Sequence, residues 1–121
     1  MKATKPLEVI YIYVSASKIQ EGDMMLFFAL DEFSQFAFKP IIGKYPKDDQ
    51  NLQENIRKLF KNIFKNKKPH HAKSSTIITN LPVETHSFIN EITNNKHLII
   101  FDPEKAEKMT KPILDEVFLD N

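Results

Sequence analysis

The chain has 121 residues, of which 41% are hydrophobic and 27% are charged, and its net charge at pH 7 is +1. This length suits a single domain over residues 1–121, and the charge excludes a strong general attraction to nucleic acid. The lack of cysteine excludes disulfides, thiolate nucleophiles and Cys-ligated zinc, and two glycines are too few for a glycine-rich phosphate loop. No apolar run approaches the ~20 residues that span a bilayer and no signal peptide is visible, so we expect a cytoplasmic protein without a membrane partner.

The first third of the chain predicts three β-strands joined by short turns. Leu7 to Val14 (LEVIYIYV) is apolar on both faces, which is typical of a strand in the middle of a sheet. A turn at Gly22-Asp23 precedes a second strand over Met24 to Leu30, and a third is expected over Gln35 to Ile42. Because Pro40 cannot donate to a ladder, the third strand should lie at the edge of the sheet.

The rest of the chain predicts helices that alternate with strands. A helix capped by Asp48 or Asp49 is expected first, because apolar residues then recur at intervals of three and four up to Phe64. The later elements are expected in this order: a strand over Ser75 to Thr79, a helix from Pro82 to about Thr93, a strand over Lys96 to Phe101, and a helix after Asp102-Pro103. Pro112 should break or kink that last helix and leave a short final helix up to Leu119.

This order of elements, β-β-β-α-β-α-β-α, predicts an α/β fold. Helical connections between the later strands imply parallel pairing through right-handed crossovers, whereas short turns imply antiparallel pairing of the first three. We therefore expect a five-stranded mixed sheet in the order 3-2-1-4-5, with helices on both faces.

Three stretches of the sequence resemble a known family. The stretch LFFALDEFSQFAFKPI (26–41) resembles the D-x-F-S-R turn and flanking strands of DDE transposase and retroviral-type integrase cores. The stretch STIITNLPVETHSFINEI (75–92) resembles that family's strand, T-D-N-G turn and helix, and KPILDEVF (111–118) resembles its late K-P-x-x-E segment. The resemblance covers roughly residues 7 to 118 and implies a ribonuclease H-like fold.

The resemblance also implies where catalytic carboxylates should stand. Family members use three acids to hold two divalent metal ions, and the matching positions here are Tyr13, Asn80 and Asp115, with Glu116 as an alternative to Asp115. Only the third position is an acid. Glu8 is the one other acid near the first strand, but its odd spacing from Tyr13 places it on the opposite face.

Two functions of different classes follow from these positions. In the first, the chain is a non-catalytic integrase-core-like module, a mobile-element remnant or accessory protein without catalytic residues, cofactor or metal. It would act through a homodimer or another protein partner, and such dimers are common in the family. In the second, it is an active nuclease or strand-transfer enzyme that integrates DNA with Mg²⁺ held by rearranged acids. The missing acids favour the first.

A basic segment over Arg57 to Lys73 has seven Lys or Arg residues and no acid. One interpretation is a non-specific DNA-binding face formed by Lys61, Lys65, Lys67, Lys68 and Lys73. The other is a solvated helix end, which the near-zero net charge favours, together with the lack of aromatic residues in the exposed part of the cluster. The adjacent His70 and His71 indicate a surface loop and not a metal site.

Overall fold

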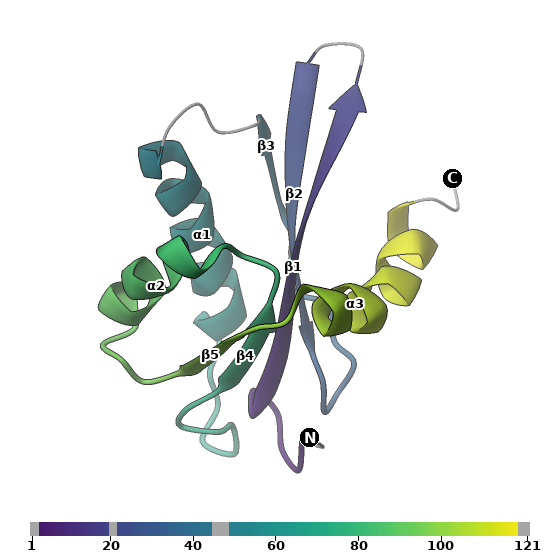
Figure 1. Ribbon diagram of the computed structural model, residues 1–121. Helices are drawn as coiled ribbons and strands as arrows, with labels where there is room; N and C mark the ends of the chain where they lie inside the picture. Colours follow the sequence, from purple (N-terminus) through teal and green to yellow (C-terminus); the bar gives the residue numbers. More distant parts are fainter. Residues whose placement is uncertain (1–2, 20–21, 45–48, 119–121) are drawn as a thin grey trace.

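The structure of the protein is a computed structural model that describes residues 3–19, 22–44 and 49–118 (Figure 1). It contains a five-stranded sheet with the order β3-β2-β1-β4-β5, which confirms the expected order. The elements are β1 (Val9–Ile19), β2 (Gly22–Asp31), β3 (Ile41–Lys44), α1 (Asp49–Phe64), β4 (Thr76–Thr79), a 3-10 turn η1 (Val83–Thr85), α2 (His86–Ile92), β5 (Leu98–Phe101) and α3 (Pro103–Phe118).

The first strand occupies the centre of the sheet, as its apolar run predicts. β1 pairs antiparallel with β2 and parallel with β4. β2 also pairs antiparallel with β3, whereas β4 pairs parallel with β5. The sheet is therefore mixed, and its two edges are β3 and β5.

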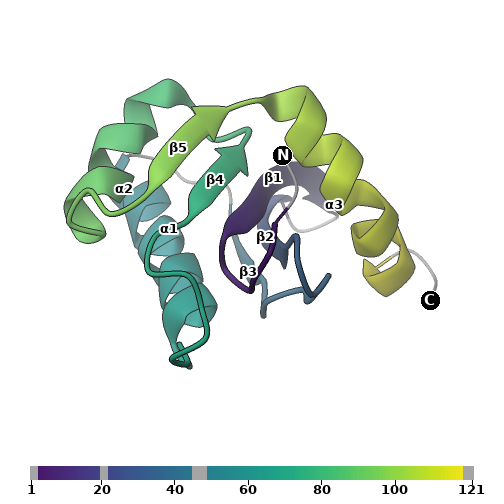
Figure 2. The ribbon, with the colours of Figure 1, turned by 90° about the horizontal axis from the view of Figure 1, so that it is seen from below.

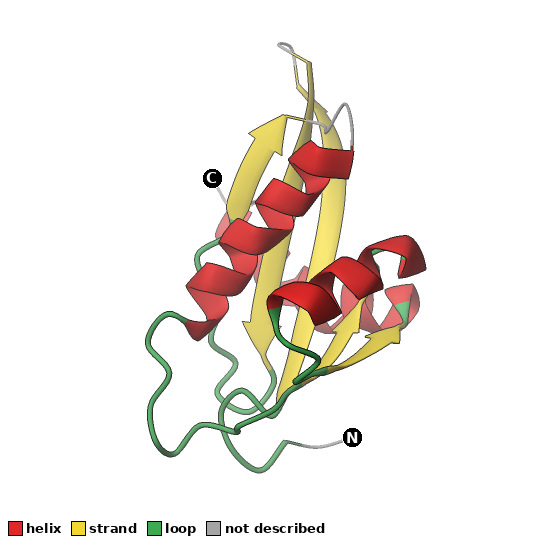
Figure 3. Ribbon diagram, turned by 90° about the vertical axis from the view of Figure 1, so that its left-hand side faces the viewer, coloured by secondary structure: helices red, strands yellow, loops and turns green. Residues whose placement is uncertain are grey.

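Helices cover both faces of the sheet, as Figures 2 and 3 show from two sides. α1 and α2 lie on one face, where Ile56, Leu59 and Ile89 pack against Ile10, Ile12 and Phe27 in one hydrophobic cluster. α3 lies on the other face, where Leu114 packs in a second cluster. The strand residues of that second cluster are Val9, Tyr11, Phe28, Leu30 and Ile78. Alternating residues of β1 thus enter opposite cores, which explains why this strand is apolar on both faces.

The β1–β2 ribbon is longer than the sequence predicts. We expected β1 to end at Val14, but it continues to Ile19, and β2 begins at Gly22 instead of Met24. Ser15 pairs with Leu26 and Ala16 pairs with Met25, so cross-strand pairing overrides the weak strand preference of the polar stretch after Val14. The residues that join the two strands, 20–21, lie outside the described residues, whereas the expected turn residues Gly22 and Asp23 belong to β2.

The third strand is shorter than predicted and begins after Pro40. It spans Ile41–Lys44, and before it only Ala37 forms an isolated antiparallel bridge, to Leu30. Proline has no N–H to donate, and the carbonyl of Lys39 instead accepts a hydrogen bond of 2.9 Å from the Asn62 amide of α1. The prediction of an edge position is confirmed, but the prediction of a strand from Gln35 is wrong.

The last helix is continuous through Pro112. α3 runs over Pro103–Phe118, so the predicted break and separate final helix are wrong. Proline lacks one N–H of the helical ladder, but packing on both sides of it holds the helix on the sheet. Leu114 belongs to the cluster beneath α3, and Met109 and Ile113 pack against that cluster.

The remaining boundaries differ from prediction by at most two residues. The first helix begins at Asp49, and Asp48 lies outside the described residues. The expected second helix is divided into η1 and α2. Within the described part of the chain, no helix is long and apolar enough to cross a membrane.

Candidate functional site

The side chain of Asn80 continues the ladder between β1 and β4. The paired residues of these strands end at Ile12 and Thr79, and Asn80 is the next residue of the chain. Its Oδ1 accepts a hydrogen bond of 2.8 Å from the Val14 N–H, and its Nδ2 donates one of 2.8 Å to the Val14 carbonyl. The planar amide takes the place of a further peptide group of β4, and an aspartate could not do so because an ionised carboxylate only accepts.

Tyr13 lies on the face of β1 that α3 covers. Its side chain is partly buried and packs against the cluster that contains Leu114, as Met109 and Ile113 of α3 also do. Burial raises the pKa of the Tyr13 hydroxyl, the negative charge of Glu107 raises it further, and Lys111 opposes both effects. A neutral phenol that packs against a helix therefore stands at the position of the first expected carboxylate.

Asp115 is on α3, one helical turn beyond Lys111 and two beyond Glu107. Together with Glu104, Lys108 and Pro112, these three residues line a shallow hollow of ≈ 400 Å³. The Glu107 carboxylate lies 3.6 Å from the Lys111 ammonium. The acid of the third position therefore stands in a stripe of mixed charge, and Glu116, its alternative, is exposed.

The three positions do not bring a group of acidic side chains together. No group of three or more His, Asp or Glu residues that could hold a metal ion occurs within ranges 3–19, 22–44 and 49–118. Two of the three positions carry a phenol and an amide, and the amide is occupied by Val14. Mg²⁺ and Mn²⁺ need several hard oxygen ligands, which Asp115 alone cannot supply.

The acids at the ends of β2 and β5 have structural partners. Asp31 is buried, and its carboxylate accepts hydrogen bonds from the Leu7 N–H at 2.9 Å, the Ser34 N–H at 3.1 Å and the Ser34 hydroxyl at 2.6 Å. Asp102 caps α3 by accepting the Lys105 N–H at 3.1 Å. Glu8 accepts the Thr4 N–H at 2.7 Å. These carboxylates fix backbone positions.

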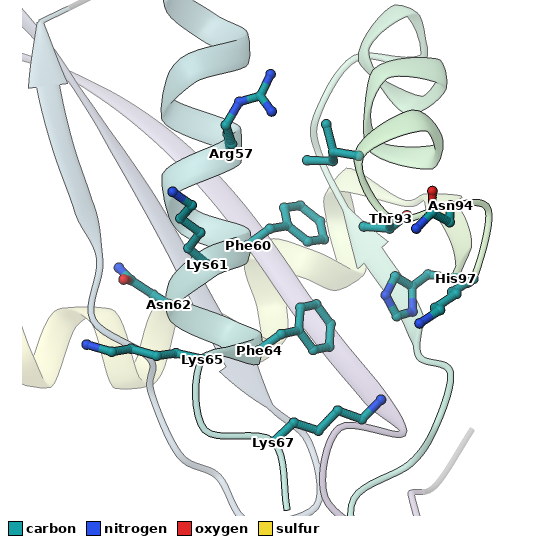
Figure 4. Close-up of a pocket in the computed structure, with 12 residues that line it drawn as sticks. Arg57, Phe60, Lys61, Asn62, Phe64, Lys65, Lys67, Thr93, Asn94 and His97 are labelled. Carbon is teal, nitrogen blue, oxygen red and sulfur yellow. The ribbon is translucent and has the colours of Figure 1, made fainter.

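A basic and aromatic groove lies between α1 and the segment that joins α2 to β5 (Figure 4). Its volume is ≈ 840 Å³, and none of the residues that line it is acidic. Its cationic side chains are Arg57, Lys61, Lys65, Lys67 and Lys96, and its aromatic ones are Phe60, Phe64 and His97. Figure 4 shows Phe60 and Phe64 projecting from α1 toward the opposite wall.

His97 belongs to that opposite wall and is held in its neutral form. Its ring stacks on Phe64 with the ring centroids 5.0 Å apart, and its Nδ1 accepts the Ser75 N–H at 3.0 Å. Burial lowers the pKa of His97, and the positive charges of Lys67 and Lys96 lower it further. Protonation of Nδ1 would remove the acceptor, so the geometry and the direction of the pKa shift agree.

The five lysines singled out from the sequence do not share one hollow. Lys61, Lys65 and Lys67 line the groove, whereas Lys68 lines a different hollow near Asp31 and Lys73 lines a third near His70. The Lys67 ammonium also donates to the Lys73 carbonyl at 3.1 Å. The sequence predicts no aromatic residue in the exposed part of this cluster. Two aromatic residues line the groove with three of its lysines, but Phe60 is buried in the core and Phe64 is partly buried.

Part of this groove could have been found in the sequence. Arg57, Lys61 and Lys65 follow one another at intervals of four, which places them on one face of a helix. His97 and Lys96 are more than 30 positions farther along the chain, and no local pattern connects them with α1. The Asn80–Val14 contact likewise joins residues 66 positions apart.

Other histidines and phenylalanines make local contacts. The rings of His70 and His71 lie 4.7 Å apart, and the Lys68 N–H donates to Nδ1 of His71 at 3.0 Å. Nε2 of His86 lies 3.1 Å from the Leu81 carbonyl. Phe36 is exposed whereas Phe38 is buried, and their rings make an edge contact at 5.2 Å.

No protein-family model and no curated protein matches the chain. Among solved structures, it is similar to a chain of the cryoEM structure of the simian T-cell lymphotropic virus intasome in complex with PP2A regulatory subunit B56 gamma, with a TM-score of 0.58 and 13% sequence identity. The match covers 99% of this chain and 44% of that chain, so this chain spans less than half the length of the solved one. At this identity the likeness shows a related fold and nothing about activity.

Proposed function

We propose that this chain is a ribonuclease H-like, integrase-core-like module that lacks two-metal catalysis and acts by associating with protein, including copies of itself. Three kinds of observation support the proposal: the sheet order, the three family-like stretches of the sequence, and the fold likeness to a chain of a retroviral intasome structure. None of these observations specifies an activity, which has to be inferred from the residues of the candidate site.

The contact between Asn80 and Val14 carries the proposal. A metal ligand must present a lone pair to the ion, but the Asn80 amide directs its oxygen and its nitrogen to the backbone of β1. Tyr13 beside it is committed to packing under α3. Both positions therefore support the sheet and its covering helix, and a two-metal mechanism needs charged ligands at both.

The exposed apolar side chains support association. The large hydrophobic residues with about half or more of their surface exposed, among those described, are Phe33, Phe36, Ile42, Val83, Leu98 and Phe101. Scattered exposed residues are ordinary, but Leu98 and Phe101 occupy one short strand at the edge of the sheet. An edge of this kind is suited to a protein partner.

The absence of catalysis is tested by metal binding and DNA cleavage. We expect Mg²⁺ and Mn²⁺ to bind no more tightly than about millimolar in a calorimetric titration, because too few hard oxygen ligands converge. We also expect no nicking of supercoiled plasmid with either ion. Metal-dependent nicking by the native chain that disappears in Asp115→Ala would overturn the proposal and establish the alternative enzyme.

A second function, weak non-specific binding of nucleic acid, is favoured by the groove. Five cationic side chains line it without an acid, although the whole molecule has a net charge of only +1. Local positive charge beside aromatic rings is the usual composition of surfaces that follow a phosphate backbone. It is tested by the dependence of duplex DNA affinity on salt concentration when lysines of the groove are changed to alanine.

A further inference from the structure

β5 ends the sheet as a four-residue apolar strand with no charged residue or proline inside it. Among the described strands it pairs with β4 alone, and no other described strand lies beside it in Figures 1 and 2. All four of its residues, LIIF, are large and apolar, and Leu98 and Phe101 expose 60% and 48% of their surface. Soluble proteins usually protect such an edge with a charge, a proline or a bulge.

The other edge of the sheet carries such protection. β3 follows Pro40 directly, and its last residue, Lys44, is exposed. Both features disfavour the addition of another strand. The two edges therefore differ in chemistry, and β5 is the one suited to a partner.

The hydrogen-bonding groups of β5 alternate between β4 and the free edge. The Leu98 N–H donates to the Ser75 carbonyl at 3.0 Å, and the Asp102 N–H donates to the Thr79 carbonyl at 2.9 Å. In a parallel ladder, alternate residues bond to the same neighbour, so Ile100 also faces β4. The N–H and C=O groups of His97, Ile99 and Phe101 therefore point to the free edge.

We propose that β5 pairs antiparallel with β5 of a second copy of this chain, about a two-fold axis at Ile99, so that one sheet continues through both copies. This inference rests on the proposed role in protein association and names the partner and the surface. Antiparallel pairing requires that outward-facing residues oppose each other. With the axis at Ile99, Ile99 opposes its own copy and His97 opposes Phe101.

Charge and shape select this register. It places Leu98 opposite Ile100, and it places Lys96 at the start of the strand opposite Asp102 at the end of the second copy's strand. Opposite charges across a strand pair are favourable. Between them Leu98 meets Ile100 and Ile99 meets its own copy, whereas the ring of His97 meets that of Phe101. A two-fold axis at Ile100 would instead place Leu98 opposite Asp102 and His97 opposite Pro103, which has no N–H to donate.

The first experiment measures self-association by sedimentation equilibrium over a series of protein concentrations. We expect a reversible dimer whose dissociation constant rises at least about tenfold in Leu98→Lys, because the added charge must be buried against the second copy. Ile42→Lys is the matched control, since Ile42 is 58% exposed on the opposite edge strand. Circular dichroism and denaturation midpoints verify that both variants fold.

The second experiment tests the register with single cysteines, which is unambiguous because the chain contains none. Opposed residues of a hydrogen-bonded pair have Cα atoms about 5.5 Å apart, within the range that a disulfide can bridge. Ile99→Cys should therefore form a disulfide-linked dimer under mild oxidation. Phe101→Cys should not, because its two copies lie about 13 Å apart along the strands.

The outcomes separate this inference from the proposed function. A chain that stays monomeric at every concentration overturns the β5 pairing, whereas the claim about catalysis still depends on the metal and nicking assays. A dimer that Leu98→Lys leaves intact also overturns it and assigns self-association to another surface. Preferential cross-linking of Phe101→Cys over Ile99→Cys contradicts the register.

Discussion

At the scale of single residues, Asn80 uses both polar atoms of its amide to hold β4 against β1. A carboxylate could still accept the Val14 N–H, but it has no donor for the Val14 carbonyl and would place a negative charge beside that oxygen. These two atoms thus stabilise the centre of the sheet at a position where the resemblance implies a metal ligand.

We expect Asn80→Asp to lower the free energy of unfolding by about 1–3 kcal/mol, the usual effect of leaving a partly buried polar group without its partner. Urea denaturation at neutral pH measures it. Asn66→Asp makes the same change on an exposed side chain and should shift stability by less than about 0.5 kcal/mol. Equal effects of the two substitutions would show that the Val14 contact does not stabilise the fold.

His97 makes stability depend on pH with a definite sign. Its pKa is lowered in the folded state by burial and by Lys67 and Lys96, so the unfolded chain binds a proton more readily. The contribution of neutral His97 to stability is therefore fully present above its unfolded pKa of about 6.5 and is lost progressively as the pH falls below that value.

We expect His97→Asn to reduce this loss, because an amide oxygen can accept the Ser75 N–H without titrating. Denaturation of the native chain and of His97→Asn at about pH 7.5 and about pH 5.5 gives the change in the free energy of unfolding of each. The pKa of His71 is lowered as well, but His71 is present in both the native chain and His97→Asn, so the difference between them reports the effect of His97. His70→Asn, at an exposed histidine, is the control, and an identical pH slope in all three proteins would refute the assignment.

At the scale of elements, α1 presents two different faces. Ile56, Leu59 and Ile63 pack on the sheet, whereas Arg57 and Lys61 lie on a separate side that borders the groove, and Lys65 follows directly after the helix. A helix can divide its residues in this way because those spaced by three and four share a side.

If Lys61, Lys65 and Lys67 each neutralise one phosphate, duplex DNA binding should show a log–log salt slope of about −2.7, and each lysine changed to alanine should remove about 0.9 of it. Fluorescence anisotropy over a salt series measures this slope. Lys108→Ala, on α3 and outside the groove, should leave it unchanged. A lack of detectable binding even at low salt would identify the lysines as the solvated end of α1.

α3 shows how packing overrides a local signal. Pro112 within the pattern predicts a break, since proline removes one hydrogen bond and crowds the preceding turn. The helix persists because apolar residues before and after it, Met109 and Ile113, pack against the same cluster. The local cost is offset by burial that the sequence pattern does not reveal.

At the scale of the whole molecule, the sheet order follows from rules of chain connection. Short connections make β1, β2 and β3 antiparallel neighbours, and helical crossovers add β4 and β5 in parallel on the other side of β1. These rules act on the type and order of elements, which hydrophobic periodicity reveals locally. For this reason the topology could be predicted although several boundaries were missed.

The sequence by itself determined the type and order of the strands and helices, that β1 is central, and that two of the three positions implied by the resemblance lack a carboxylate. Each of these depends on residue type and on spacing within a few positions. The tertiary structure decided that Asn80 closes on Val14, that Lys96 and His97 complete the groove of α1, and that Ile99 and Phe101 direct their peptide groups to an open edge. Those features depend on residues far apart in the chain, and only folding sets their distances and directions.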